Sequence, residues 1–373
     1  SLVDHHKKKI MMQISSLASL ALYAIGCAIY LLAPGEAFKD VASPVLWTLV
    51  TVLLAGVLVG NIRTIALPTL VTILIPEDRR DKANGLVGSA TGAAFLIVSV
   101  ISGLMMGLWG ITSIFILAIS LTLVTLAHLW FIPVPEKGIV HTEDGGVRKT
   151  DIKGTVAAIL AVPGLAALIL FTTFNNFLGG AYMALMDAYG LSLMSVETWG
   201  FLWAVVSLGF IFGGLAIAKF GLGKNPLRTM FIANIVLWII SCLFTIQSSI
   251  WLLAIGMFLY MCIGPLVEAS EQTIIQKVVP QKRQGRVFGF AQSVEMAASP
   301  LTAFLIGPIT QFVFIPFMTT GAGVDWIGGW YGVGPDRGIA LVFTLVGLIG
   351  LLVTLIAMGT KYYRLLSAQY TKA

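Results

Sequence analysis

Long apolar stretches recur along the chain, and they constrain its fold more than any other feature of the sequence. A helix needs about 20 mostly apolar residues to cross the hydrocarbon core of a bilayer. Stretches of that kind lie near residues 10–32, 44–75, 85–107, 110–132, 155–186, 198–219, 228–247, 250–278, 287–317 and 337–360. Because backbone polar groups in lipid must bond within the protein, these stretches predict an all-α membrane protein with ten transmembrane helices.

Composition supports this fold class and excludes several functions. The chain is 58% hydrophobic and 11% charged, whereas about a quarter of the residues in a soluble domain are charged. Basic residues flank membrane segments for topological reasons, so the net charge of +6 does not indicate nucleic-acid binding. The three cysteines and four histidines are scattered, and no phosphate-binding loop occurs. We therefore expect a lipid bilayer as partner, and no enzyme activity, metal or cofactor.

Basic residues concentrate in alternate loops, which predicts the topology. One set of loops carries them at residues 7–9, 79–82, 137–153, 219–228, 277–286 and 361–372, whereas the other set holds only Lys39 and Arg337. Loops rich in Lys and Arg stay in the cytoplasm, so both ends of the chain are expected there. Residues 133–154 form the longest polar stretch and are predicted to be a cytoplasmic linker, and residues 361–373 a cytoplasmic tail.

Two segments resemble each other at an offset of 204 residues. "IPEDRRDKANG" (75–85) and "VPQKRQGRVFG" (279–289) share Pro, Arg, a second basic residue and Gly at matching positions. They predict a parallel repeat of six-helix halves, with residues 1–132 in the first half and 155–360 in the second. The first half would then lack two helices, which we expect to precede residue 1 in a twelve-helix protein. A chance similarity of two basic loops remains the alternative.

The chain resembles the major facilitator superfamily, and within it a bacterial branch that exports macrolides and siderophores. The resemblance lies in "WGFLWAVVSLGFIFGGLAIAKFG" (199–221), in "RQGRVFGFAQSVEMAASPLTAFLIGP" (283–308) and in "VDHHKKKIM". In the last of these, Asp4, Lys8 and Lys9 match a cytoplasmic gating loop of the family. Of the antiporter signature on the fifth helix, only Gly103 matches. The resemblance implies the major facilitator fold, with one transmembrane path lined by helices of both halves, in a bacterial cytoplasmic membrane.

Charged residues inside apolar stretches are the candidates for coupling, because a charge at mid-bilayer is costly and usually functional. These candidates are Arg63, Glu268, Glu271 and Glu295. Arg63 lies thirteen residues before Pro76, and Glu268 twelve before Pro280, so the repeat places the two at similar depth. An Arg63–Glu268 pair would lower the cost of burying either charge. The alternative is a static pair that only orders the helices.

Polar and aromatic residues on the helices expected to line the path are candidates for substrate contact. They are Asn175, Asn176, Tyr182, Tyr260 and Gln292. Hydrogen bonds between helices are the alternative role of the two asparagines. Asp187 is expected at the membrane interface, and Gly209 and Gly213 in close helix packing.

The sequence therefore predicts a secondary active transporter. The resemblance implies export of hydrophobic or amphipathic small molecules by alternating access, driven by protons or another ion. Solute uptake or facilitated diffusion stays open as an alternative. So does a membrane receptor or scaffold that transports nothing, although such a protein gains little from buried charges.

Overall fold

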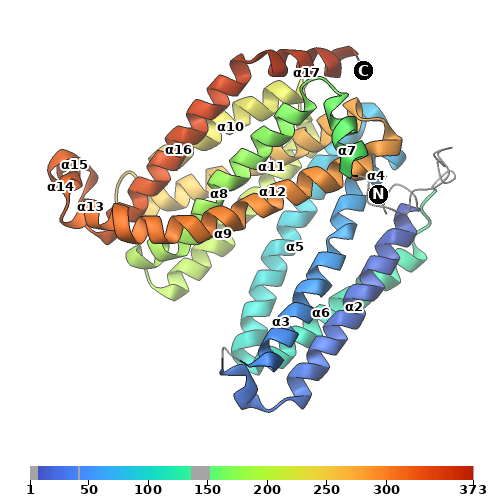
Figure 1. Cartoon of the computed structure of the whole chain (residues 1–373), viewed down its shortest axis with the longest axis horizontal. Helices are drawn as coiled ribbons and strands as arrows, with labels where there is room; N and C mark the ends of the chain where they lie inside the picture. The colour runs from blue at the N-terminus through green and yellow to red at the C-terminus, as the bar shows by residue number, and fades with distance from the viewer. Residues whose placement is uncertain (1–6, 41–42, 136–151, 373) are drawn as a thin grey trace. The chain divides into compact units, whose positions relative to one another are not determined.

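The computed structural model describes residues 7–40, 43–135 and 152–372 (Figure 1). Ten helices in these ranges are long and apolar enough to cross a membrane, which confirms the predicted fold class. They are Lys8–Leu32, Pro44–Leu74, Glu77–Trp109, Ile111–Phe131, Leu165–Leu193, Val196–Phe220, Pro226–Leu243, Ile250–Val278, Gln281–Thr319 and Pro335–Gly359. Most of the predicted linker, and Asp4 of the predicted gating loop, lie outside the described residues.

The chain divides into two compact units. The first holds residues 1–76, 97–151 and 281–286, and the second holds 77–96, 152–280 and 287–373. Helix α5 (Arg80–Trp109) thus contributes its first part, up to residue 96, to the second unit. The repeat of two six-helix halves stays a prediction.

In the first unit, helix α2 (Lys8–Leu32) packs against α3 (Pro44–Gly60), α4 (Ile62–Leu74) and α6 (Ile111–Phe131). Serine hydroxyls of α2 bond to backbone carbonyls of α3. Ser15 Oγ donates to the Val59 carbonyl at 2.6 Å, and Ser19 Oγ donates to the Gly56 carbonyl at 2.9 Å. The hydrophobic effect does not drive helices together in lipid, so close packing of small residues and hydrogen bonds hold them together.

The second unit is built around four helices: α8 (Leu165–Leu193), α9 (Val196–Phe220), α10 (Pro226–Leu243) and α11 (Ile250–Val278). Helix α11 packs against both α9 and α10, and α16 (Pro335–Gly359) packs against α8 and α10. The core includes Tyr189, Met257 and Phe343.

Glycines bring helices α9 and α11 into backbone contact. A Cβ atom at Gly209 would lie 2.7 Å from the Phe258 carbonyl oxygen, and one at Gly213 would overlap the Cys262 carbonyl. The predicted close packing at this pair is confirmed. No larger residue fits there without moving one helix away from the other.

A buried arginine ties the elements at one end of the second unit. Arg337, on α16, is 2% exposed. It donates to backbone carbonyls of Tyr331, Thr245 and Ile246 at 2.7–2.9 Å, and to hydroxyls of Tyr189 and Ser248. Its guanidinium lies 4.5 Å from the Tyr331 ring centroid. This arrangement spreads the buried charge over several dipoles.

The predicted start of the fifth span, residue 155, is wrong. Residue 155 lies inside a short separate helix, α7 (Ile152–Leu160), and the span α8 begins at Leu165. Pro163 lacks a backbone N–H, and Gly164 has φ of 85°. A left-handed residue directly after a proline separates the two helices.

The predicted tail is an ordered amphipathic helix, α17 (Lys361–Lys372), which packs against α8, α11 and α16 (Figure 1). Leu366 is 2% exposed and fills the space that Gly164 leaves. Asn225 donates to Ser367 Oγ at 2.8 Å, and the Lys277 ammonium lies 4.5 Å from the Tyr370 ring centroid. The segment is therefore an integral part of the second unit.

Candidate functional site

Two of the predicted carboxyl groups meet at one hydroxyl in the second unit. Thr172 on α8 has its Oγ1 atom 2.6 Å from Glu295 Oε1 and 3.2 Å from Glu271 Oε1. Glu271 comes from α11, and Glu295 from α12 (Gln281–Ile309). The structure thus brings together side chains that are 99 and 123 residues from Thr172 along the chain. We call these three residues the carboxyl cluster.

The number of hydrogens limits how this cluster can bond. The Thr172 hydroxyl also lies 3.1 Å from the Ile169 carbonyl and 3.3 Å from the Leu168 carbonyl, yet it carries one hydrogen. Carbonyls and ionised carboxylates only accept. Both carboxyl contacts are hydrogen bonds only when one of the two carboxyl groups carries a proton. The geometry is therefore compatible with one proton shared between the two acids and the hydroxyl.

The other two charged candidates make hydrogen bonds to other partners in the described part of the chain. Glu268 is exposed and accepts from Gln272 Nε2 at 3.4 Å, one helical turn away. Arg63 belongs to the first unit, where its Nη1 donates to Ser16 Oγ at 3.0 Å. The proposed pairing of Arg63 with Glu268 joins residues of different units and stays a prediction.

The two asparagines make hydrogen bonds within the second unit. Asn175 Nδ2 donates to the Phe171 carbonyl at 2.8 Å, and its Oδ1 accepts from Trp238 Nε1 at 2.8 Å. Asn176 Nδ2 donates to the Thr172 carbonyl at 3.0 Å. Asn175 therefore links α8 to α10, which agrees with the alternative role considered from the sequence. Gln292 is half-buried on α12.

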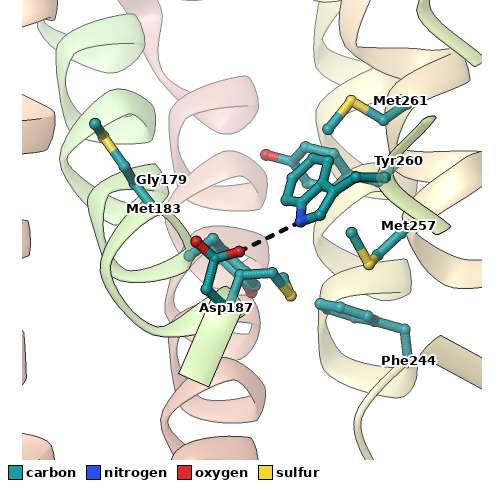
Figure 2. A pocket seen from close by; sticks show the side chains of 10 residues that line it. Gly179, Met183, Asp187, Phe244, Met257, Tyr260 and Met261 are labelled. Carbon is teal, nitrogen blue, oxygen red and sulfur yellow. Dashed lines mark hydrogen bonds between the residues drawn. The ribbon is translucent and has the colours of Figure 1, made fainter. Parts of the chain in front are cut away.

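A cavity of about 350 Å³ lies among α8, α9, α11 and Phe244, entirely within the second unit (Figure 2). Tyr182 and Tyr260, both predicted as substrate contacts, line it. Their ring centroids are 6.3 Å apart, and Tyr182 also stacks on Phe343 at 4.8 Å. Four methionines complete much of the wall: Met183, Met186, Met257 and Met261. The volume is in the range of small-molecule sites.

Asp187 is the one charged residue among those that line the cavity, and sequence reasoning missed it. Its Oδ1 accepts from the indole Nε1 of Trp199 at 2.9 Å and of Trp203 at 3.3 Å. Figure 2 draws the second of these bonds as a dashed line. Asp187 lies six residues before the end of α8, which is why it was expected at the membrane interface. The sequence did offer one signal: Trp199 and Trp203 lie one helical turn apart on the next predicted span, so both indoles can reach the same acceptor.

The lysines of the predicted gating loop begin helix α2. Lys9 Nζ lies 2.6 Å from the Ile132 carbonyl and 3.2 Å from the Trp130 carbonyl, at the end of α6. A cation at a helix C-terminus is stabilised by the unsatisfied carbonyls there. Lys8 is the first residue of the same helix.

Comparisons with known proteins agree on one family. A family model described as Major Facilitator Superfamily matches residues 1–303. The chain is 25% identical over 244 residues to the inner membrane transport protein YajR of Escherichia coli, covering 60% of this chain and 49% of YajR. It therefore spans about half the length of that curated relative.

Solved structures share the fold. The human organic anion transporter MFSD10 superposes with a TM-score of 0.67 at 14% identity, covering 94% of this chain and 78% of MFSD10. The Escherichia coli fucose:proton symporter FucP superposes with a TM-score of 0.61 at 12% identity, covering 94% and 85%. At these identities the likeness concerns the fold.

Proposed function

Because the chain belongs to the Major Facilitator Superfamily, we propose that it is a proton-coupled secondary transporter whose carboxyl cluster binds the coupling proton. The observation that carries this proposal is the shared Thr172 hydroxyl between Glu271 and Glu295. Its proposed substrates are hydrophobic or amphipathic small molecules, and its proposed direction is export. The resemblance to macrolide and siderophore exporters supports that direction. The proposed location is a bacterial cytoplasmic membrane, with both ends of the chain in the cytoplasm as the basic loops predict.

Protonation of the cluster changes which bonds hold α8 to its neighbours. With one proton present, a carboxyl can donate to Thr172 Oγ1 while the hydroxyl donates onward to the second carboxylate. Without it, two negative charges face the same oxygen and repel each other. The loss of a proton thus weakens the contacts of α8 with α11 and α12, which gives the chemical reason for a conformational step.

The cavity and the carboxyl cluster share helices α8 and α11. Tyr182 is ten residues beyond Thr172 on α8, and Tyr260 is eleven residues before Glu271 on α11. At 1.5 Å per residue, each separation is about 15 Å. A change in the angle between α8 and α11 therefore reaches both places, which would couple proton binding to substrate binding without direct contact between them.

The proposal is tested by transport of erythromycin by the full-length protein in proteoliposomes with an imposed pH gradient. Glu271→Gln keeps the size of the side chain but cannot take up or lose the proton. We expect it to abolish accumulation against a concentration difference while downhill exchange persists. Glu197→Gln, which changes an exposed carboxyl group at the start of α9, serves as the matched control.

If wild type and Glu271→Gln accumulate the substrate equally against a concentration difference, the carboxyl cluster does not couple transport to protons. The carboxyl groups would then be a structural tie between helices.

A further inference from the structure

The cavity in the second unit combines one negative charge with aromatic faces. Among its lining residues Asp187 alone is charged, and it is anionic. Four aromatic side chains, Tyr182, Trp203, Phe244 and Tyr260, contribute to the wall. The ring centroids of Tyr260 and Phe244 lie 6.3 and 6.0 Å from that of Tyr182. The faces of such rings carry partial negative charge.

The Asp187 carboxylate is held in place by hydrogen bonds to one of its two oxygens. Trp199 and Trp203 both donate to Oδ1, and these are the hydrogen bonds to Asp187 within the described part of the chain. Trp199 is 5% exposed, so its indole is fixed by the surrounding core. Asp187 itself is exposed rather than packed into that core. Its second oxygen, Oδ2, accepts no hydrogen bond from the described residues, and Asp187 is one of the residues that line the cavity.

From this arrangement we propose that the cavity binds a flat organic cation, with the positive charge facing Asp187 Oδ2 and the ring system between the aromatic side chains. This rests on the proposed function, for which it names the class of substrate. The cation is of the quaternary ammonium or pyridinium type, because such groups have no hydrogen-bond donors to satisfy. A neutral ligand would make no ionic contact with Asp187, the one acidic residue among those that line the cavity.

The other features of the wall favour the same class. A cation within about 6 Å of a ring centroid is attracted by the ring quadrupole, and more strongly where water is excluded. Methionine side chains are flexible and polarisable, so the wall adapts to ring systems of different outline. An organic anion meets the opposite conditions at every one of these groups, since both the carboxylate and the ring faces repel it.

The test is equilibrium binding of two probes to the full-length protein purified in detergent. One probe is 1-methyl-4-phenylpyridinium, a permanent cation, and the other is biphenyl-4-carboxylate, an anion on a similar two-ring frame. We expect the cation to bind at least tenfold more tightly, which corresponds to about 1.4 kcal/mol. Asp187→Asn retains the shape and an oxygen that accepts from the indoles, and is expected to weaken cation binding at least tenfold.

Matched variants separate the charge from the packing. Tyr260→Phe keeps the ring and is expected to keep the affinity for the cation within twofold, whereas Tyr260→Leu removes the ring face and lowers that affinity several-fold. Glu197→Gln alters an exposed carboxyl group at the start of α9 and is expected to have no effect. Thermal unfolding of each variant in the same detergent confirms that it is folded.

Equal binding of the two probes, or an unchanged affinity for the cation in a folded Asp187→Asn protein, would overturn this assignment. The binding assay uses no gradient, so it is independent of proton coupling. If the cation binds through Asp187 but Glu271→Gln still accumulates substrate uphill, the cavity stands and the coupling role of the carboxyl cluster falls.

Discussion

The hydroxyl of Thr172 is the smallest part of the coupling proposal that can be tested by itself. Thr172→Val removes the hydroxyl and keeps the branched shape, so Glu271 and Glu295 lose their common partner. We expect uphill transport by this variant to fall at least tenfold, with fewer protons moved per substrate. Thr172→Ser keeps the hydroxyl and is expected to retain coupling. Proton and substrate fluxes recorded together in proteoliposomes give the stoichiometry.

A Thr172→Val variant that moves protons and substrate in the wild-type ratio would show that the hydroxyl is not needed. Glu271 and Glu295 would then have to share a proton without the Thr172 hydroxyl.

Arg337 is expected to be a stabilising residue of the second unit. The guanidinium of Arg337 donates to several buried carbonyl oxygens, and Arg337→Gln leaves most of them without a donor. We expect the free energy of unfolding to fall by about 2–3 kcal/mol, seen as a lower Tm in detergent. Arg79→Gln is the control, because the Arg79 side chain is 76% exposed and its ion pair with Asp78 measures 3.9 Å. Similar Tm values for the two variants would contradict this role.

The sequence identified part of the candidate site and missed part of it. Glu271 and Glu295 stand out because a carboxyl group in an apolar run is rare and costly. Thr172 does not stand out, since threonines are common in membrane helices and nothing local shows that one faces two acids from distant segments. Asp187 was placed by its distance from a helix end, and that distance does not tell which face of the helix it occupies.

At the scale of the elements, apolar length alone located ten spans, most of them within a few residues of their ends. It placed the start of the fifth span at residue 155 instead of Leu165, and it gave no sign of the last helix, α17. Pro163 and Gly164 divide one apolar run into two helices. The hydropathy of the run does not reveal this break, although the Pro-Gly pair is itself a signal for one. The last helix is polar overall and packs through one face, so its hydropathy resembles that of a loop.

Leu366 is expected to anchor helix α17 to the rest of the second unit. Leu366→Ser introduces a hydroxyl where a 2% exposed side chain now fills the space beside Gly164. The helix should detach, so that trypsin cleaves within residues 361–372 several-fold faster than in the wild type. Leu365→Ser changes a neighbouring side chain that is 46% exposed and should not alter the rate. Equal cleavage of both variants would show that Leu366 does not hold the helix.

For the whole molecule, the distribution of basic residues predicts the orientation in the membrane. In a background with Cys27, Cys242 and Cys262 replaced by alanine, single cysteines are introduced as Lys224→Cys and Lys39→Cys. Both lysines are exposed, so the new thiols are reachable. We expect a membrane-impermeant maleimide to label position 39 in intact cells and position 224 only after the membrane is opened. The reverse pattern would refute the prediction from charge.

The glycine contact between α9 and α11 is a position where a single mutation could alter the cavity during evolution. Trp203 on α9 and Tyr260 on α11 both line the cavity, and the backbones that carry them touch at Gly209 and Phe258. One methyl group at position 209 would push the two helices apart and enlarge the space between those side chains. A mutation at position 209 would therefore change the size of molecule that fits the proposed binding cavity, although Gly209 is not among the residues that line it.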